Sequence, residues 1–326
     1  MRVLVTGGAG YIGSVAVEQA QVAGHEVVVV DNLWRGHRGA VPADVKFHQC
    51  DLRDYDGLLR VVMGTRPDAI MHFAAATLVP ESMEEPLLYF DVNTVGSHNL
   101  ISAAIKADVP RFIFSSTAAT YGNPDIDLLT EETPLDPINP YGQSKLMVEE
   151  MLHWHRRRYG LNVAIFRYFN VGGATHDHGE DHSPETHLIP VALEVAQGKR
   201  QNFTVFGSDY ETRDGTCIRD YVHVADLGDA HLLAVDWLSS NTWGVFNLGT
   251  ANGSSVQEII RAVETTTEQT LPVIDGPRRN GDPARLIASS SRARDMLGWI
   301  PARSTVEQLV GSAWDWMQRY PNGYED

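Results

Sequence analysis

VLVTGGAGYIG, residues 3–13, is the stretch that decides the fold. Its first four residues form a short apolar run that predicts a buried strand. Gly8, Gly10 and Gly13 fit the pattern G-x-G-x-x-G, whereas Gly7 with Gly10 and Gly13 fits the related G-x-x-G-x-x-G. In both patterns the glycines permit a tight turn into a helix and let the backbone approach a pyrophosphate. The stretch therefore predicts a dinucleotide-binding turn.

An acidic residue stands where such a turn requires one. The segment from His25 to Asp31, HEVVVVD, predicts a second strand, and Asp31 ends it, about 20 residues after the glycines. A carboxylate there accepts hydrogen bonds from the ribose hydroxyls of adenosine and repels a 2′-phosphate. The pattern therefore predicts NAD rather than NADP, and the alternative is an α/β turn that binds no nucleotide.

Strands and helices alternate through the first half of the chain. Further strands are predicted at 69–73, 111–115 and 162–167, and helices at 15–23, 92–107 and 141–159. The strands are almost continuously apolar, which is typical of a parallel sheet with helices on both faces. We therefore predict an α/β fold: a Rossmann-type doubly wound parallel sheet, followed by a smaller α/β substrate-binding C-terminal domain.

The alternation breaks near residue 170. Beyond it, helices are predicted only at 188–197 and 256–267, between turn-rich stretches. We therefore predict an NAD-binding domain over 1–170 and a second, substrate-binding domain over 171–326. A helix followed by a strand within 223–248 would return to the first domain.

The composition argues against several classes of protein. A formal net charge of −16 disfavours nucleic-acid binding, which needs clustered lysine and arginine, and equally disfavours an anionic membrane surface. The two cysteines, Cys50 and Cys217, argue against a disulfide framework and favour a cytoplasmic protein. The sequence shows neither a signal peptide nor an apolar run long enough to span a membrane.

A tyrosine and a lysine lie four residues apart in NPYGQSK, residues 139–145. Residues spaced in this way share one face of a helix, so Tyr141 and Lys145 stand together, and Pro140 suits the helix start. A nearby ammonium group and a nicotinamide cation would lower the tyrosine pKa from about 10 toward 7, which predicts a general base for a sugar or alcohol hydroxyl. Thr117, at the carboxyl end of a predicted central strand, would share a hydrogen bond with the same oxygen. The alternatives are an ordinary surface pair and a polar strand end.

Eight motifs extend this pattern over nearly the whole chain: TGGAGYIG, DNL, HFAA, SSTAATYG, PYGQSK, RYFNVGGA, RDYVHVADL and RRNGDPA. In this order they resemble the extended short-chain dehydrogenase/reductase family and, within it, the UDP-glucose 4-epimerases. The resemblance implies reversible C4 epimerisation of UDP-galactose and UDP-glucose through a 4-keto intermediate, with bound NAD, in a homodimer.

The resemblance also implies which residues form the sites. The catalytic residues would be Thr117, Tyr141 and Lys145. The cofactor would contact Gly7, Gly10, Tyr11, Ile12, Gly13, Asp31, Asn32, Asp51, Leu52, Phe73, Ala74, Ala75, Asn93, Ser115, Tyr141, Lys145 and Phe169. The UDP-sugar would contact Thr117, Tyr141, Asn170, His187, Leu188, Phe206, Arg219, Arg279, Asp282 and Leu286. The two arginines suit a diphosphate because a planar guanidinium binds two oxygens at once.

Three positions depart from the family's pattern. Thr77 stands where many members have lysine, and Val92 replaces the first residue of the usual Asn-Asn pair, which leaves Asn93. Leu286 stands where some members carry a tyrosine beside the sugar's C2 group. Because leucine leaves more room, we expect N-acetylated UDP-hexosamines to be accepted as well.

The residues after Thr117 discriminate among reactions of the family. Dehydratases have an acidic pair there, whereas Ala118 and Ala119 cannot transfer protons, which disfavours dehydration. The alternatives that stay open are another UDP-hexose or UDP-hexuronate 4-epimerase and a non-catalytic NAD-binding scaffold. Such scaffolds commonly lose the tyrosine–lysine pair that this chain keeps.

The segment 172–187 is rich in residues that bind metals. It contains HDHGEDH from His176 to His182, with His187 beyond. The spacing matches neither a helical site nor a zinc finger, and the implied reaction needs no metal. We therefore predict a solvated loop over the substrate and no metal site.

Overall fold

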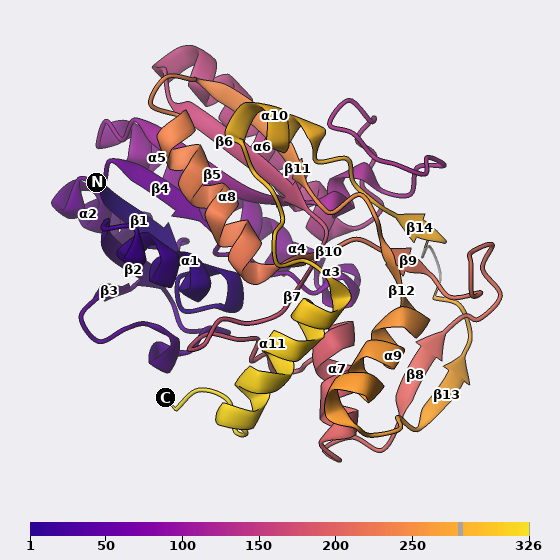
Figure 1. The fold of residues 1–326 in the computed structure, drawn as a ribbon. Helices are drawn as coiled ribbons and strands as arrows, with labels where there is room; N and C mark the ends of the chain where they lie inside the picture. The colour runs from indigo at the N-terminus through magenta and orange to yellow at the C-terminus, as the bar shows by residue number, and fades with distance from the viewer. Residues whose placement is uncertain (280–282, 326) are drawn as a thin grey trace.

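Seven parallel strands form the central sheet of a computed structural model that describes residues 1–279 and 283–325 (Figure 1). In spatial order the strands are β11 (Trp243–Leu248), β6 (Asn162–Tyr168), β5 (Arg111–Thr117), β4 (Ala69–His72), β1 (Arg2–Thr6), β2 (Glu26–Asp31) and β3 (Lys46–Gln49). The order of the strands reverses between β1 and β4. At such a reversal the carboxyl ends of the strands open a crevice where α/β sheets bind ligands.

Helices cover both faces of this sheet, which confirms the predicted Rossmann-type fold (Figure 1). Side chains along β1 alternate between two buried clusters: Val3 and Val5 belong to one and Leu4 to the other. The first cluster includes residues of α1 (Tyr11–Val22) and α8 (Val224–Trp237), and the second includes residues of α2 (Tyr55–Thr65), α5 (Gly96–Lys106) and α6 (Pro140–Tyr159). Burial on both faces explains the continuously apolar strands.

The single helix predicted at 92–107 is interrupted. Two short helices, α3 (Val79–Glu84) and α4 (Pro86–Tyr89), lead into a π-helical turn, η2 (Phe90–Val95), and only then into α5. The wider turn buries Asn93, whose amide binds the backbone of Ala76 at 2.7 and 3.0 Å and the hydroxyl of Ser144 at 3.0 Å. These contacts explain why the regular helix starts late, since π-turns commonly occur where a side chain has such a special role.

The C-terminal part of the chain forms a smaller α/β unit at the lower right of Figure 1. Its helices α7 (Leu188–Ala196), α9 (Val256–Thr267) and α11 (Val306–Arg319) enclose a third buried cluster. Short strands form the rest: β8 (Phe203–Phe206) with β13 (Val273–Gly276), and β9 (Ile218–Arg219) with β12 (Ser254–Ser255) and β14 (Arg285–Leu286). Strands of two to four residues carry no periodic pattern, so the sequence does not predict them.

The remaining elements join the two parts. β7 (Asn170–Gly172) pairs with β10 (Tyr221–His223), and α8 and β11 then return to the central sheet, where α8 packs on α1. Three short elements complete the fold: η1 (Arg38–Ala40), η3 (Ala118–Tyr121) and α10 (Ser291–Leu297).

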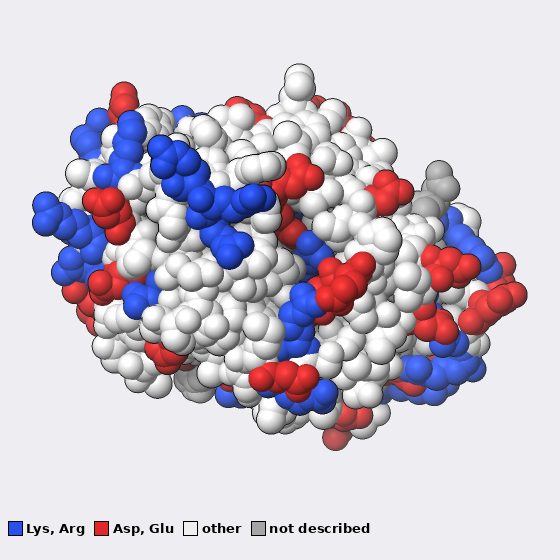
Figure 2. All heavy atoms as spheres, turned by 90° about the horizontal axis from the view of Figure 1, so that it is seen from above, with Lys and Arg blue, Asp and Glu red and all other residues white. Residues whose placement is uncertain are grey.

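The molecular surface mixes both signs of charge. Figure 2 shows basic side chains gathered on one part of the face seen from above, with acidic side chains nearby. Three consecutive arginines, Arg156 to Arg158, occupy the last turn of α6, where cations are favoured by the negative end of the helix macrodipole. Among the described residues, no helix combines the length and apolar character needed to cross a bilayer.

Candidate active site

The turn between β1 and α1 has the geometry of a phosphate-binding loop. Gly7 has a φ of +75°, and a Cβ placed there would lie 2.5 Å from the backbone nitrogen of Ala74. A Cβ on Gly13 would lie 2.0 Å from the carbonyl oxygen of Gly7, whereas at Gly10 the nearest atom would be 3.4 Å away. Gly7 and Gly13 therefore close the turn, and Gly10 leaves its outer side open to a ligand.

Asp31 is fixed beside this turn. Its carboxylate accepts hydrogen bonds from the backbone nitrogens of Ala9 at 3.1 Å and Leu33 at 2.9 Å. Burial raises its pKa above the ordinary value, although these hydrogen bonds oppose the shift. Because a carboxylate can accept about four hydrogen bonds, Asp31 keeps capacity for ribose hydroxyls.

A single cleft joins this turn to the C-terminal unit. Its volume is about 1290 Å³. The predicted site residues that line it are Gly7, Gly10, Tyr11, Ile12, Gly13, Asp31, Asn32, Asp51, Leu52, Phe73, Ala74, Ala75, Thr117, Tyr141, Lys145, Phe169, Asn170, His187, Leu188, Phe206, Arg219, Arg279 and Leu286. The fold therefore brings together residues that lie up to 279 positions apart in the sequence, counting from Gly7 to Leu286.

Two predicted residues that the structure describes are not on the wall of this cleft. Asn93 is buried behind it, where it ties the backbone of Ala76 to α6. Ser115 also lies behind the wall, with its hydroxyl 3.1 Å from Nε2 of the buried His231. Asp282 lies outside the described residues.

The proposed catalytic side chains meet where β5 ends and α6 begins. Asn139 caps α6 by accepting a hydrogen bond from the nitrogen of Gly142 at 2.8 Å, which fixes the first turn that carries Tyr141. The Thr117 hydroxyl is hydrogen-bonded to the Tyr141 phenol. One helical turn on, Lys145 donates from Nζ to the carbonyl oxygen of Ser115 at 2.9 Å. All three side chains thus face the cleft from two adjacent elements.

The expected lowering of the Tyr141 pKa is not a property of the cofactor-free chain. Burial raises the pKa of Tyr141 above 10, and the hydrogen bond with Thr117 offsets only part of that shift. Burial also lowers the pKa of Lys145 to about 7, although the charge of Glu149 opposes this. Because burial disfavours the charged form of both side chains, the cofactor-free chain does not by itself favour a tyrosinate.

The cleft contains further side chains that the motifs do not single out. Tyr168 ends β6 beside Tyr141, and burial raises its pKa, with a smaller opposing effect from a hydrogen bond with Ser115. Arg35 lies four residues after Asp31, with Nη2 bound to both carboxylate oxygens of Glu81 at 2.6 and 2.8 Å. Tyr168 directly follows a predicted strand and Arg35 lies in the turn after another, and these positions are the only sequence signal that could have found them.

The far end of the cleft is built by the C-terminal unit. The guanidinium of Arg279 lies over the ring of Phe206, 4.1 Å from its centroid. Arg219 on β9 is buried and donates from Nη1 to the carbonyl oxygen of Ile218 at 2.7 Å. Leu286 on β14 is paired with Arg219 in the strand register. Two cationic groups, an aromatic ring and a leucine therefore converge at one end.

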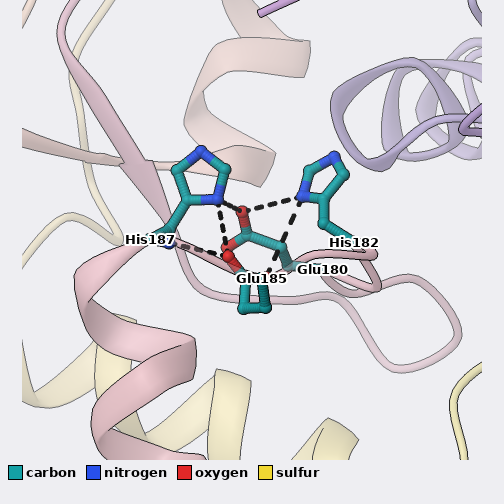
Figure 3. A group of neighbouring side chains, drawn as sticks. All are labelled: Glu180, His182, Glu185 and His187. Atoms are coloured by element: carbon teal, nitrogen blue, oxygen red, sulfur yellow. Dashed lines mark hydrogen bonds and ion pairs between the residues drawn. The ribbon is translucent and has the colours of Figure 1, made fainter. Parts of the chain in front are cut away.

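The histidine-rich segment is a loop that is solvent-exposed at His176 and Asp177, as predicted, but buried further along. His178 is buried, with Nδ1 2.8 Å from Glu18 and Nε2 3.0 Å from the carbonyl oxygen of Ala40. Further along, Glu180, His182, Glu185 and His187 form a cluster (Figure 3). The loop is ordered in this way because its carboxylates are buried against imidazoles, which the sequence spacing does not reveal.

Comparison with known proteins agrees with this geometry. Residues 3–249 match the NAD dependent epimerase/dehydratase family. A UDP-glucose 4-epimerase of Streptococcus mutans is 51% identical over 100% of this chain and 99% of its own length. A UDP-glucose 4-epimerase structure from Brucella ovis in complex with NAD has a TM-score of 0.94 at 41% identity, covering 96% of this chain and 97% of that one.

The name of a third relative includes two sugar nucleotides, UDP-Glc and UDP-GlcNAc. The structure of the UDP-Glc/GlcNAc 4-epimerase of Campylobacter jejuni has a TM-score of 0.87 at 44% identity, covering 98% of this chain and 99% of that one. Together with the glycine turn, the acid after β2 and the tyrosine–lysine pair in one cleft, these similarities establish that the chain belongs to the NAD dependent epimerase/dehydratase family.

Proposed function

We propose that the protein interconverts UDP-galactose and UDP-glucose by inverting C4 of the hexose through a 4-keto intermediate. The observation that carries this proposal is one cleft that joins the glycine turn, the Thr117–Tyr141–Lys145 group and the arginine-containing far end. Its volume of about 1290 Å³ exceeds the roughly 300–1,000 Å³ typical of a pocket for one small ligand. A cofactor and a sugar nucleotide can therefore lie end to end with the tyrosine between them.

NAD is the cofactor of this family, and the residues present suit it. The open side of Gly10 and the free amides at the start of α1 would hold its pyrophosphate, and Asp31 its adenosine ribose. When bound, it supplies the hydride acceptor for C4 and returns that hydride to the opposite face of the sugar.

The chain's own residues would move the proton. Tyr141 would take it from O4 of the hexose during oxidation and return it during reduction, while Thr117 holds the phenol oxygen in place. Lys145, anchored on the carbonyl oxygen of Ser115, would steady the developing negative charge on the phenol. Ala118 and Ala119 line the same region and carry no ionisable group, so the acidic pair that elimination of water requires at these positions is missing.

Inversion requires that the sugar present both faces to one cofactor. The C-terminal unit would hold the nucleotide firmly, through the cationic Arg219 and Arg279 and the ring of Phe206. Around the hexose, small or apolar side chains such as Ala118 and Leu286 offer few hydrogen bonds. A firmly held diphosphate with a loosely held hexose permits the 4-keto sugar to turn about its linkage.

Purified protein given UDP-galactose without added cofactor should produce UDP-glucose. We expect this because a cofactor enclosed in so deep a cleft would copurify with the chain, and NMR of the nucleotide sugars would follow the conversion. Absence of product even after NAD is added would contradict the proposal. Faster conversion of UDP-galacturonate than of UDP-galactose would instead indicate a hexuronate epimerase, and tight NAD binding with no turnover a scaffold protein.

We also propose that N-acetylated UDP-hexosamines are substrates. Leu286 packs with Phe169 and Ala118 at the cleft, and the C. jejuni relative is named for both UDP-Glc and UDP-GlcNAc. Leu286→Tyr should lower kcat/KM for UDP-N-acetylglucosamine by about 10-fold or more, because steric selection in a pocket is worth about 1–3 kcal/mol. Its kcat/KM for UDP-galactose should stay within about twofold of the unsubstituted protein. Equal losses on both substrates would refute the idea.

The organisation of the protein is also a proposal. We infer domains 1–170 and 171–326 with 223–248 returning to the first, which is supported by the pairing of β11 with β6 and the packing of α8 on α1.

A homodimer is supported by exposed apolar side chains on neighbouring helices of the first domain, namely Met83, Leu87, Val95 and Trp154. A cytoplasmic location is supported by the low cysteine content of the sequence, which has only Cys50 and Cys217.

A further inference from the structure

His187 is held at one edge of its ring by two buried carboxylates. Its Nδ1 lies 2.8 Å from Oε1 of Glu180 and 2.8 Å from Oε1 of Glu185. The glutamate side chains are 7% and 6% exposed, whereas the histidine side chain is 40% exposed and lines the cleft. The exposed part of the ring is therefore its other edge, and Figure 3 shows Nε2 turned away from both carboxylates.

The two carboxylates are themselves fixed. Glu185 Oε1 also accepts hydrogen bonds from the backbone nitrogens of Thr186 and His187, both at 2.7 Å. Glu180 Oε1 also lies 3.2 Å from Nδ1 of His182. Neither carboxylate can turn away from Nδ1 of His187 without losing these partners, so the Nδ1 edge of the ring stays covered.

This arrangement favours a protonated imidazole. The charge of Glu180, with a smaller contribution from Glu185, raises the pKa of His187 to about 11, although burial opposes the shift. The other titratable or charged groups around the cluster are His182, whose ring centroid is 5.3 Å away, Arg200, which donates to the carbonyl oxygen of Glu185 at 2.9 Å, and Tyr11, edge-on to His182.

We propose that Glu180 and Glu185 are positioning residues that hold His187 as an imidazolium whose Nε2–H donates to a diphosphate oxygen of the bound UDP-sugar. The inference rests on the proposed function, and it adds a third cation to Arg219 and Arg279 in the same cleft. A neutral histidine would choose between two tautomers, one of which presents a lone pair to the phosphate. In the imidazolium that the paired carboxylates favour, both ring nitrogens carry a proton, so the Nε2–H donor is always present.

UDP affinity across pH tests the role of the carboxylates. We expect Glu180→Gln/Glu185→Gln to bind UDP about as tightly as the unsubstituted protein near pH 6, and about 10-fold or more weakly near pH 9, because His187 then titrates near its ordinary value of about 6.5. The control is His176→Gln, which changes an exposed histidine that is paired with Asp177 in this loop. The ratio of its UDP affinity to that of the unsubstituted protein should stay constant with pH. Dividing the UDP affinity of each variant by that of the unsubstituted protein at the same pH cancels the contributions from titration of Lys145 and of UDP, because all variants share them.

Removing the donor supplies the second test. His187→Gln should weaken UDP binding by about 10- to 100-fold at every pH, since a hydrogen bond to a charged group is worth about 1.5–3 kcal/mol. Calorimetric titration with UDP gives these affinities without turnover, so they stand apart from whether the protein epimerises sugars. The proposal would be overturned if the UDP affinity of the double variant relative to the unsubstituted protein did not change with pH. It would also be overturned if His187→Gln bound UDP within twofold of the unsubstituted protein. One tightly bound Zn²⁺ per chain that is lost from the double variant would overturn it too, because the imidazoles would then be metal ligands.

Discussion

Replacing Tyr141 with phenylalanine should lower kcat for UDP-galactose by about 10³-fold or more and leave UDP affinity unchanged. Phenylalanine keeps the ring, including its edge-to-face contact with Tyr89 at 6.4 Å between centroids, and removes only the oxygen that bonds to Thr117. A positioned general base contributes about 10²- to 10⁴-fold. The phenol oxygen is the only part of this side chain that the proposed chemistry uses, so the loss should appear in kcat rather than in binding.

Tyr168→Phe is the matched control for this variant. Both tyrosines line the cleft, and burial raises the pKa of both phenols. Tyr168, however, is hydrogen-bonded to Ser115 behind the wall, whereas Tyr141 is bonded to Thr117 at the end of β5. We expect Tyr168→Phe to lose less than about 10-fold in kcat, because it removes no proton-transfer group. If kcat fell further in Tyr168→Phe than in Tyr141→Phe, Tyr168 rather than Tyr141 would be the general base.

The pKa values in the cofactor-free chain constrain how Tyr141 can act. Burial places the pKa of Tyr141 above 10 and that of Lys145 at about 7. Near neutral pH the tyrosine is therefore protonated and the lysine is only partly charged. A nicotinamide cation in the cleft would favour the charged phenolate, so the base would become available only when the cofactor is bound.

The features that the sequence predicts well depend on local rules. The run from Val3 to Gly13 predicts its strand, turn and helix because each glycine has a steric reason within a few residues. Tyr141 and Lys145 share a face because helix geometry alone requires it. Motif resemblance then predicts the part of the cleft wall at the sheet, because the motif-bearing strands β1, β2, β4, β5 and β6 all end at one edge of the sheet.

The features that the sequence does not predict depend on contacts between distant segments. Helix α11 begins with a capping box from Thr305 to Gln308, which is a local feature. Its apolar face, however, is buried by contacts with α7 and α9, which are distant in the sequence. The π-turn before α5 depends on Asn93 reaching Ala76. The imidazole–carboxylate cluster depends on a loop that folds back against α1, and pKa directions depend on burial, which no spacing reveals.

Replacing Glu149 with glutamine should lower the free energy of unfolding by about 3 kcal/mol or more. Glu149 is buried on α6, and its carboxylate accepts hydrogen bonds from Nε and Nη2 of Arg167 at 3.0 and 2.5 Å and from the Ser116 hydroxyl at 2.5 Å. Glutamine keeps the size but removes the charge, which leaves the guanidinium of Arg167 buried without a counter-ion. Breaking a buried ion pair from one side costs about 3–5 kcal/mol. Urea unfolding at neutral pH, compared with Glu150→Gln at the exposed neighbouring position, measures the difference.

A second variant distinguishes the lost charge from lost packing. Glu149→Met/Arg167→Met removes both charges and keeps apolar volume, so it should recover most of the stability that the single substitution loses, as apolar replacements of buried ion pairs often do. If Glu149→Gln stays within about 1 kcal/mol of the unsubstituted protein, the pair has no such role. The substitution also reaches the active site, because the charge of Glu149 raises the pKa of Lys145, one turn away on α6. Without that charge Lys145 should lose its proton at a lower pH. The free energy of unfolding and the charge state of Lys145 beside Tyr141 therefore both depend on the carboxylate of Glu149.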